Sequence, residues 1–430
     1  MAKRCLIVTY YFPPLGGGGV QRMAKLSKYL ARAGWQVTVI TADETNNHLE
    51  KDTSLLAEIA EDVNILYLPT RLPASRVMPS KRLISGERQV SYFKRWLSAF
   101  FYVPDIRKGW IKPAGQAVLQ ELERNVYDCV LVSVPPFSLA ILAKQLQDQL
   151  SVPVILDMRD PWTINPYKIH PTIFHRLFDK KLERDIISNL QYGISITESL
   201  LSYYRETVPH FKPENWLCIP NGYDEEDFSH LTVQVDTRNG NTFDIGFLGT
   251  FYSHINLPHD LFAGMALLNS SRKSGTKHVH FHHIGKANID LKKLARKFGV
   301  EKQVVLHGYL PHLEALARLS EMDAFCIIAD TRNPKSRYTG GSKFYEYLRL
   351  RKPILALLPR GSDAAETIIN TDAGVVVESS EHDKIARTLK SWMENPPAFS
   401  FKGIEQFSRE NQARTFIRFF EDIARAEKKG

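Results

Sequence analysis

The feature that most limits the folds open to this chain is a repeated alternation of short apolar runs with helical windows. Cys5–Thr9 is one such run, a glycine-rich stretch follows it, and Gln36–Ile40 is the next run. The window between them has helical periodicity, and Gly34 stands where that helix should end. Apolar runs that are buried on both faces are typical of a parallel sheet with helices on each side.

The helix predicted between these two runs has two distinct faces. Its apolar positions are expected to pack on the sheet: Val20, Met23, Ser27, Leu30 and Ala31. Its basic positions are expected to face solvent: Arg22, Lys25, Lys28 and Arg32.

The same alternation continues along the chain and restarts after a polar stretch at residues 223–242, which we interpret as a linker. Before it, strands are expected at Cys129–Val132, Val154–Leu156 and Tyr192–Ile196. After it, strands are expected at Phe243–Leu248, Val279–Ile284, Val304–Leu306, Ala324–Ile328, Pro353–Leu357 and Gly374–Val377. A chain of 430 residues is also longer than one core usually supports. The prediction is an α/β protein with two Rossmann-like, doubly wound domains facing across a cleft.

Composition excludes several other classes of protein. The chain is 43% hydrophobic and 24% charged, which is ordinary for a folded globular protein. The longest uncharged apolar stretch, Cys129–Ala143, contains two prolines and is shorter than the roughly 20 residues that span a bilayer. The amino-terminal residues run directly into a predicted strand, so we expect no secretory signal and a cytoplasmic protein. Four scattered cysteines, with no CxxC and no His/Cys cluster, predict buried reduced thiols rather than disulfides or a zinc site.

The positive charge of the chain is concentrated in one segment. The formal charge is +9, and between Arg71 and Lys112 ten basic residues are opposed only by Glu87 and Asp105, for a local charge of +8. This pattern indicates one basic surface rather than a generally cationic protein.

Aromatic residues recur at helical spacing inside that basic segment. They are Phe93, Trp96, Leu97, Phe100 and Phe101. One interpretation is an interfacial helix that places these side chains in a lipid surface and its cations near anionic headgroups. The alternative is an ordinary amphipathic helix that packs them into the domain. Nucleic acid is not expected as a partner, because no nucleic-acid-binding signature accompanies the charge.

Two glycine-rich stretches precede predicted helices. The first, Gly16–Gly19, lacks the Lys-Ser/Thr of a Walker loop, but Gly17 and Gly18 permit close approach of a ligand to backbone N–H groups. A merely flexible loop is the alternative.

The second glycine-rich stretch runs from Tyr338 to Leu348. Ser342 is a natural N-cap after Gly340 and Gly341, and with Lys343 these residues can form a cradle for a diphosphate. Glu346 lies one turn further on and can accept hydrogen bonds from two vicinal hydroxyls. The alternative is a capped helix with a surface glutamate.

Charged side chains follow directly after a predicted strand at Leu156–Trp162. In an open α/β sheet, residues at the carboxyl end of a strand face the ligand crevice. Asp157, Arg159, Asp160 and Trp162 are therefore candidate site residues, and a structural Asp–Arg pair is the competing interpretation.

In order and spacing, these stretches together resemble the retaining glycosyltransferases of family 4, which have the GT-B fold. The resemblance covers essentially the whole chain. The stretches are Tyr11–Arg22, Asp157–Trp162, Ile196–Ser199, Pro220–Asp224, Gly308–Pro311 and Glu346–Ala356.

The resemblance implies a division of labour between the domains. Residues 1–222 would form the acceptor-side domain, residues 243–398 the nucleotide-sugar domain, and residues 399–430 a helix that crosses back. Glu346 matches the second of two family glutamates and is implied to bind ribose hydroxyls, whereas Tyr338 stands at the position of the first. The strand end at Gly249 and Thr250 lacks the family's usual cations.

Charge at the donor is therefore expected from Lys343, with Lys335 or Arg337. Asp160 lies near the position of the family's catalytic-pocket histidine. We thus expect Asp160 and Lys343 in catalysis, Asp157, Arg159 and Trp162 on the acceptor side, and the remaining donor contacts from Gly17, Gly18, Gly249, Thr250, Arg337, Tyr338, Gly340, Gly341, Ser342, Lys343 and Glu346.

The expected reaction moves a sugar from a nucleoside-diphosphate sugar to an acceptor hydroxyl with retention. One acceptor suggested by the basic aromatic segment is a polyprenyl-diphosphate-linked saccharide in envelope or capsule polysaccharide synthesis, reached by a protein peripheral to the cytoplasmic membrane. A cytosolic small-molecule acceptor is the alternative. No Asp-x-Asp occurs, so no cofactor and no metal-bridged donor is expected. Alternatives are a nucleotide-sugar epimerase, an inactive nucleotide-binding scaffold and, last, a nicotinamide oxidoreductase.

Overall fold

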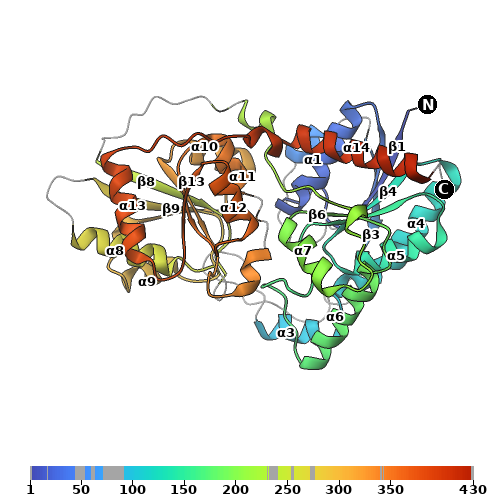
Figure 1. Ribbon diagram of the computed structural model, residues 1–430, viewed down its shortest axis with the longest axis horizontal. Coiled ribbons are helices and arrows are strands. Elements are labelled where there is room, and N and C mark those ends of the chain that lie inside the picture. Colours follow the sequence, from blue (N-terminus) through green and yellow to red (C-terminus); the bar gives the residue numbers. More distant parts are fainter. Residues whose placement is uncertain are drawn as a thin grey trace. The chain divides into compact units, whose positions relative to one another are not determined.

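The chain folds into two compact α/β units, each with its own sheet (Figure 1). The first unit is Met1–Pro220 with Arg409–Gly430, and the second is Asn221–Ser408. The computed structural model describes residues 2–16, 18–43, 54–59, 63–70, 92–229, 231, 241–252, 256–271, 277–338, 341 and 343–427.

The first unit is built on a parallel seven-stranded sheet of order β3-β2-β1-β4-β5-β6-β7. Its strands are β1 (Arg4–Thr9), β2 (Gln36–Asp43), β3 (Val63–Pro69), β4 (Cys129–Val134), β5 (Val154–Met158), β6 (Tyr192–Ser195) and β7 (Trp216–Cys218). The central strand β1 pairs with β2 on one side and with β4 on the other, so Ile7 lies opposite both Val39 and Leu131. Every predicted strand of this half is confirmed, and β3 and β7 are additional.

Helices cover both faces of this sheet, as the alternation predicted. They are α1 (Gly18–Arg32), α2 (Ser54–Glu58), α3 (Tyr92–Phe101), α4 (Ile111–Arg124), α5 (Ser138–Gln149), α6 (Ile173–Ile187), α7 (Glu198–Thr207) and α14 (Arg409–Glu427), with 3-10 turns at Ile106–Trp110 and Pro213–Asn215. Gly34 follows α1 with φ +83°, a conformation that favours glycine, and the chain there turns into β2.

The predicted solvent face of α1 is wrong for three of its four basic residues, and only Arg32 is exposed as expected. Arg22, Lys25 and Lys28 are all buried, because α2 and α14 cover that side of the helix. Lys25 and Lys28 both pair with Glu58 of α2, and the Arg22 guanidinium lies 5.2 Å from the ring centre of Phe416 on α14.

The last helix, α14, belongs to the first unit although the second unit precedes it in the chain. Its apolar side joins the core of the first sheet through Ala413, Phe416, Phe420 and Ile423. Phe420 packs edge-on against Trp35, with ring centres 5.9 Å apart.

The second unit is built on a parallel six-stranded sheet of order β10-β9-β8-β11-β12-β13. Its strands are β8 (Thr242–Leu248), β9 (His278–Ile284), β10 (Val304–Gly308), β11 (Ala324–Ile328), β12 (Ile354–Leu357) and β13 (Gly374–Val377). All six were predicted within one or two residues. Residues 223–229, which were expected in a linker, are part of this unit and form a bridge between Tyr223 and Ser408.

Two apolar cores lie on opposite faces of this second sheet. One is closed by α8 (His259–Ser270), α9 (Leu291–Arg296) and α13 (His382–Glu394), and the other by α10 (His312–Ser320), α11 (Phe344–Leu350) and α12 (Asp363–Asn370). Four 3-10 turns complete the described part of the unit, at Glu225–Phe228, Glu301–Gln303, Pro334–Tyr338 and Ile404–Phe407.

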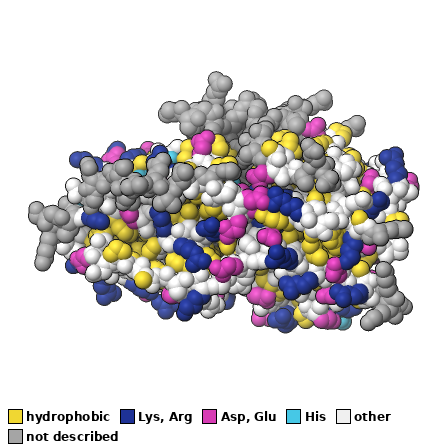
Figure 2. Space-filling model, turned by 90° about the horizontal axis from the view of Figure 1, so that it is seen from above, with side chains coloured by type: hydrophobic (Ala, Val, Ile, Leu, Met, Phe, Trp, Pro, Cys, Tyr) yellow, Lys and Arg dark blue, Asp and Glu magenta, His cyan; other side chains and the backbone are white. Residues whose placement is uncertain are grey.

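The cysteines and the surface agree with the composition. Cys5, Cys129 and Cys326 are buried, as predicted, whereas Cys218 is partly exposed, and none of the four forms a disulfide. On the face drawn in Figure 2, Lys and Arg side chains are interspersed with Asp and Glu side chains over both units. Half of the basic segment, residues 71–91, lies outside the described residues. No helix in the described part of the chain combines the length and the apolar character needed to cross a bilayer.

Candidate functional site

Arg159 joins the loops at the carboxyl ends of the central strands of the first unit. Its guanidinium donates to the carbonyl oxygens of Val134 (3.2 Å) and Pro135 (2.7 Å), at the end of β4, and to that of Gly19 in the first turn of α1. Burial lowers the pKa of Arg159 from its usual value, and the neighbouring carboxylate of Asp157 opposes that shift. Because β1 pairs with β2 on one side and β4 on the other, this is the switch point where open α/β sheets bind ligands.

Asp157, at the end of β5, is fully buried beside this loop junction. Its carboxylate accepts hydrogen bonds from Arg22 Nη2 (2.8 Å) and from the Ser133 hydroxyl (2.7 Å). Arg22 also donates to the carbonyl oxygen of Pro220, at 2.8 Å. The structural Asp–Arg pair that we weighed therefore exists, but the partner is Arg22 rather than Arg159. Asp157 holds α1 against the sheet.

Asp160 and Trp162 follow on the same loop but differ in their surroundings. Trp162 is fully buried, stacks on Phe137 and donates from its indole nitrogen to Asp179 at 3.0 Å. Asp160 is partly exposed, and burial raises its pKa to about 6 despite the nearby Arg159. Of the two, Asp160 is the side chain that can meet a ligand.

In the second unit, the main chains just after β8 and β9 pass very close to each other. A side chain at Gly285 would meet the carbonyl oxygen of Gly249 at 2.2 Å, and Gly285 has φ +135°, so glycine is required there. The Gly249 N–H donates to the carbonyl oxygen of Ile284 at 2.9 Å, and the Gly249 carbonyl oxygen accepts from His283. Burial lowers the pKa of His283 to about 4. Thr250 continues this loop, and its carbonyl oxygen accepts from Asn256. The end of β8 therefore presents main chain rather than long side chains.

Glu346 is positioned next to this strand end by its neighbour on α11. The Tyr347 hydroxyl accepts from the Leu248 N–H at 2.6 Å, which fixes α11 against the end of β8. The Glu346 carboxylate is buried, and its Oε1 lies 3.9 Å from His312 Nδ1. His312 Nε2 in turn lies 3.0 Å from Asp227 Oδ2. Glu346, His312 and Asp227 thus form a carboxylate–imidazole–carboxylate row, in which Asp227 is within hydrogen-bond distance of His312 and Glu346 is not.

The remaining predicted donor residues come from the segment before α11. Lys343, rather than the expected Ser342, occupies the N-cap position of α11; its side chain makes no capping hydrogen bond and is partly exposed. The carbonyl oxygen of Gly341, which has φ +43°, accepts from Asn221 at 3.4 Å. Arg337 is exposed with its guanidinium 5.8 Å from the ring centre of Tyr338. Gly17, Gly340 and Ser342 lie outside the described residues. Gly18, the other predicted glycine of the first loop, is the first residue of α1.

Three positioning residues were missed from the sequence. Arg22 was placed on a solvent face, and His312 and Asp227 were not singled out at all. The available signals were weak: His312 follows the Gly308–Pro311 stretch, and Asp227 ends the acidic run after Asn221. Neither position reveals that Asp227 and His312, which are 85 residues apart in the chain, lie together beside the helix that carries Glu346.

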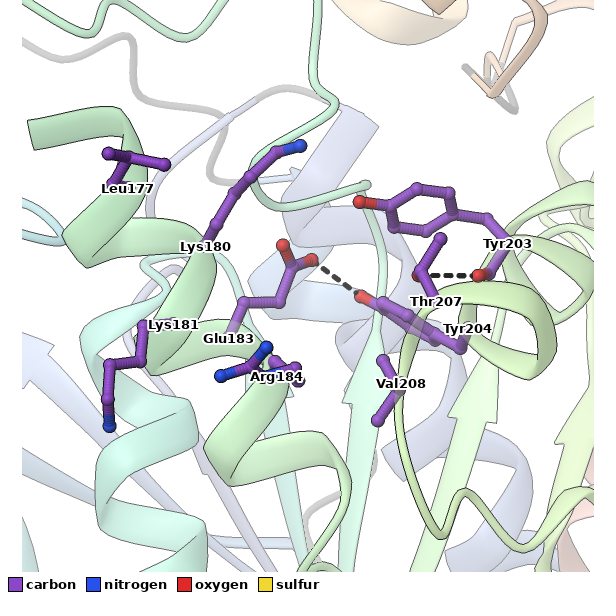
Figure 3. A pocket seen from close by; sticks show the side chains of 9 residues that line it. All are labelled: Leu177, Lys180, Lys181, Glu183, Arg184, Tyr203, Tyr204, Thr207 and Val208. Atoms are coloured by element: carbon purple, nitrogen blue, oxygen red, sulfur yellow. Dashed lines mark hydrogen bonds between the residues drawn. The ribbon is translucent and has the colours of Figure 1, made fainter. Parts of the chain in front are cut away.

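A separate cavity of about 430 Å³ lies between α6 and α7 in the first unit (Figure 3). Its buried acid, Glu183, accepts from the Tyr204 hydroxyl at 3.0 Å and from the hydroxyl and N–H of Thr163. Burial raises the pKa of Glu183 to about 7, and these hydrogen bonds only partly oppose the shift. Lys180, Lys181 and Arg184 line the same cavity.

Two known families match the chain and together cover most of it. The family described as "Glycosyl transferases group 1" matches residues 237–413, and the one described as "Glycosyl transferase 4-like domain" matches residues 17–222. A search of curated proteins gives no match.

Solved structures of the same fold are similar over their full length. Sucrose-phosphate synthase from Thermosynechococcus elongatus is 14% identical, with a TM-score of 0.67, and the match covers 99% of this chain and 100% of that one. WaaG, a glycosyltransferase involved in lipopolysaccharide biosynthesis, is 14% identical with a TM-score of 0.57, covering 99% and 100%. A Staphylococcus aureus TarM mutant, in a complex containing UDP, is 11% identical with a TM-score of 0.61, covering 97% and 99%. At these identities the likeness establishes the GT-B fold.

Proposed function

The chain belongs to the group 1 glycosyltransferases with a glycosyltransferase 4-like domain, and we propose that it transfers a sugar to an acceptor hydroxyl with retention. Enzymes of this family take the sugar from a nucleotide sugar. In this proposal the second unit binds the nucleoside-diphosphate sugar and the first unit binds the acceptor. The enzyme would be a hexosyltransferase that needs no metal for turnover.

The observation that carries the proposal is the buried carboxylate of Glu346 on α11, the helix that Tyr347 joins to the backbone-lined end of β8. A buried carboxylate can accept hydrogen bonds from both ribose hydroxyls, and hydrogen bonds to a charged group are the stronger ones. The absence of side chains at Gly249 and Gly285 supports close approach of a nucleotide to the strand ends.

The difficult event is departure of the diphosphate from an oxocarbenium-like carbon, which builds negative charge on the leaving oxygens. We assign its stabilisation to Lys343 and Arg337, to backbone N–H groups from Gly340 to Ser342, and to the glycine loop that contains Gly17 and Gly18. Tyr338 and Thr250 would complete the donor contacts. The carboxylate of Asp160 would stabilise the positive charge on the sugar.

A panel of nucleoside diphosphates tests the donor assignment. UDP, GDP and ADP are each added to the full chain, and the ligand that binds the folded form raises the unfolding midpoint. The matching nucleotide sugar is then incubated with the protein alone, because an epimerase would convert the donor without an acceptor, whereas a transferase leaves it intact apart from slow hydrolysis. If none of the nucleotides shifts the midpoint, the donor assignment is incorrect.

The acceptor proposal rests on an exposed apolar surface formed by α3 and α6, which we call the α3–α6 surface. Its large side chains are Phe93, Phe100, Phe101, Ile173, Phe174, Leu177 and Phe178. Phe93 is 63% and Phe101 68% exposed, so the stripe on α3 is not packed into the domain at its ends. The two helices are joined where His175 Nε2 lies 3.0 Å from the Phe100 carbonyl oxygen (Figure 1).

Cations surround these apolar side chains. On α6 the exposed basic residues are Arg176, Lys180, Lys181 and Arg184. Apolar groups flanked by cations on a surface helix suit the headgroup region of an anionic membrane. We therefore propose a peripheral protein on the cytoplasmic face of the membrane whose acceptor is a lipid-linked saccharide of envelope or capsule polysaccharide synthesis.

Vesicle flotation tests this surface. Phosphatidylcholine vesicles with phosphatidylglycerol are expected to carry the protein, and vesicles without phosphatidylglycerol to carry less. The F174S/F178S double variant should stay unbound, whereas the matched L119S/V126S variant, which changes exposed apolar residues on and just after α4, should bind normally. Equal binding by the two variants would exclude the α3–α6 surface as the contact.

A further inference from the structure

Strand β9 of the second unit is rich in histidine. Three of its histidine side chains lie on the face of the sheet that α10 covers. His278, His280 and His282 occupy alternate positions of β9, so they share one face, while Val279 and Phe281 enter the core on the other face. His280 lies directly opposite Asp244 of β8 in the parallel register. We expected no histidine cluster from the sequence. The structure corrects this, because the period of two and the pairing of β8 with β9 gather side chains that the sequence keeps apart.

Three ligand atoms converge between these two strands. Asp244 Oδ1 lies 3.3 Å from His282 Nε2 and 3.8 Å from His280 Nδ1, and all three atoms lie within 4.8 Å of one another. Ligands held tetrahedrally at about 2.0–2.1 Å from a zinc ion are roughly 3.4 Å apart. The Asp244–His282 distance already fits, and the His280 side chain, which is 31% exposed, has room to rotate its Nδ1 closer to the other two ligand atoms.

A second group of contacts orients these ligands. His282 Nδ1 lies 3.0 Å from His307 Nε2, and the two rings stack 5.3 Å apart. When His282 donates from Nδ1, its Nε2 keeps the lone pair that a metal needs. Among the described residues, His282 Nε2 is buried and makes no hydrogen bond. The backbone at Asp244 is fixed by its N–H, which donates to Asp323 at 2.7 Å.

We propose that Asp244, His280 and His282 bind one divalent transition-metal ion, with Zn²⁺ as the preferred ion and a water molecule as fourth ligand. Two imidazoles and one carboxylate suit zinc better than magnesium or calcium, which prefer all-oxygen sites. His307 is a positioning residue, because metal-bound histidines usually donate their other ring N–H to such a partner.

The position of this site makes it structural rather than catalytic. Asp244 lies five residues before Gly249 along β8, a distance of about 16 Å in a parallel strand. The donor contacts lie at the carboxyl ends of the strands, and the metal would join β8 to β9 towards their amino ends. Removing it should therefore loosen this edge of the sheet while the rate of sugar transfer at moderate temperature stays unchanged.

The test uses the full chain without a polyhistidine tag. The protein is dialysed against a chelator and loaded with Zn²⁺ or Co²⁺, excess metal is removed, and bound metal is measured by elemental analysis and, for Co²⁺, by visible absorption. We expect one ion per chain, an intense absorption band typical of low-coordinate Co²⁺, and a rise in the unfolding midpoint on loading.

Variants assign the ligands. H280A and H282A should each abolish stoichiometric binding, and H307A should weaken it by about 10- to 100-fold. The matched control is H278A, an exposed histidine on the same face of the same strand, which should retain the metal. His280 is partly exposed, so H280A should fold even where H282A does not, and its midpoint without metal checks this.

Two results would overturn the proposal. One is failure of the unaltered, folded protein to retain Zn²⁺ or Co²⁺, which would leave an ordinary hydrogen-bonded Asp–His cluster. The other is equal metal retention by H280A, H278A and the unaltered chain. Neither result depends on nucleotide binding, so failure here is distinct from failure of the proposed glycosyl transfer.

Discussion

At the scale of single residues, burial decides which charged side chains can act on a ligand. Arg22 and Asp157 are both almost fully buried and bind each other at 2.8 Å, whereas Asp160, three positions later, is partly exposed. In the sequence, Asp157 and Asp160 are equivalent candidates, and Arg22 was expected to face solvent. Their environments separate a structural pair from a carboxylate that is available for chemistry.

Replacing Arg22 by methionine should strongly destabilise the protein. The substitution leaves the carboxylate of Asp157 buried without its cation, which typically costs about 3–5 kcal/mol. Urea denaturation measures the loss, and the R22M/D157L double variant should recover part of it because no charge is then left unpaired. An R22M protein as stable as the unaltered one would mean that solvent reaches Asp157.

Replacing Glu346 by glutamine should impair use of the donor while preserving the fold. Losing hydrogen bonds to a charged acceptor costs about 1.5–3 kcal/mol, which corresponds to roughly a 10- to 100-fold fall in kcat/KM. Steady-state kinetics with varied donor measure the effect. E366Q, at an exposed position of α12, is the control and should behave like the unaltered enzyme. Normal kinetics for E346Q would remove Glu346 from the donor site.

The pKa of Asp160 predicts a limb in the pH profile of sugar transfer. Burial raises this pKa to about 6, so the carboxylate that would stabilise the oxocarbenium-like carbon forms only above that pH. The value of kcat/KM should therefore rise with pH through about 6 and then level off. D160N should be slow and lack this limb, whereas a limb that persists in D160N belongs to another group.

At the scale of helices and strands, the chain's own pattern predicted most of the fold. Each predicted strand forms, because buried parallel strands are continuous apolar runs that stand out from their surroundings. β3 was missed because it is an edge strand in which buried and exposed positions are mixed, and β7 because it has only three residues. The wrong face of α1 has a different cause: the helices that bury Arg22 and Lys25 are remote in sequence, and no local periodicity reveals them.

The buried acid Glu183, between α6 and α7, predicts that the free energy of unfolding depends on pH. The pKa of Glu183 is about 7 in the folded protein, against 4.5 when solvated, so folding favours the protonated acid. Its contribution is complete below pH 4.5 and is lost as the pH rises through 7, by about 3 kcal/mol. E183Q avoids this loss and should gain stability relative to the unaltered protein between pH 5 and pH 8.

Urea denaturation at the two pH values measures that relative gain. E198Q, which removes an exposed carboxylate at the start of α7, is the control and should show no comparable change with pH. A difference between E183Q and the unaltered protein that is the same at both pH values would show that Glu183 titrates normally.

At the scale of the whole molecule, the two α/β units predicted from the sequence are confirmed, whereas the donor site at Glu346 stays a prediction whose surroundings the sequence did not reveal. Glu346 was identified from its place on a helix after two glycines. His312, which lies next to its carboxylate, and Asp227, which pairs with His312, come from segments 34 and 119 residues earlier in the chain. Such contacts depend on the strand order of the second sheet, in which β8 and β11 are neighbours although two strands separate them in the sequence.

The assignment of donor binding to the second unit predicts where a nucleotide protects the backbone. In hydrogen–deuterium exchange of the full chain, the nucleoside diphosphate that raises the unfolding midpoint should slow exchange in peptides covering 247–252, 284–288 and 343–350. These peptides contain the ends of β8 and β9 and the whole of α11. Binding holds the closed form of these amides and suppresses local opening, so protection should scale with occupancy.

Peptides from β5 and β6 serve as the internal reference, since the proposal places no donor contact there. Protection confined to the first unit would move the nucleotide to the other sheet and reverse the roles of donor and acceptor units. Protection of 343–350 that disappears in E346Q would tie the whole-molecule assignment to one carboxylate.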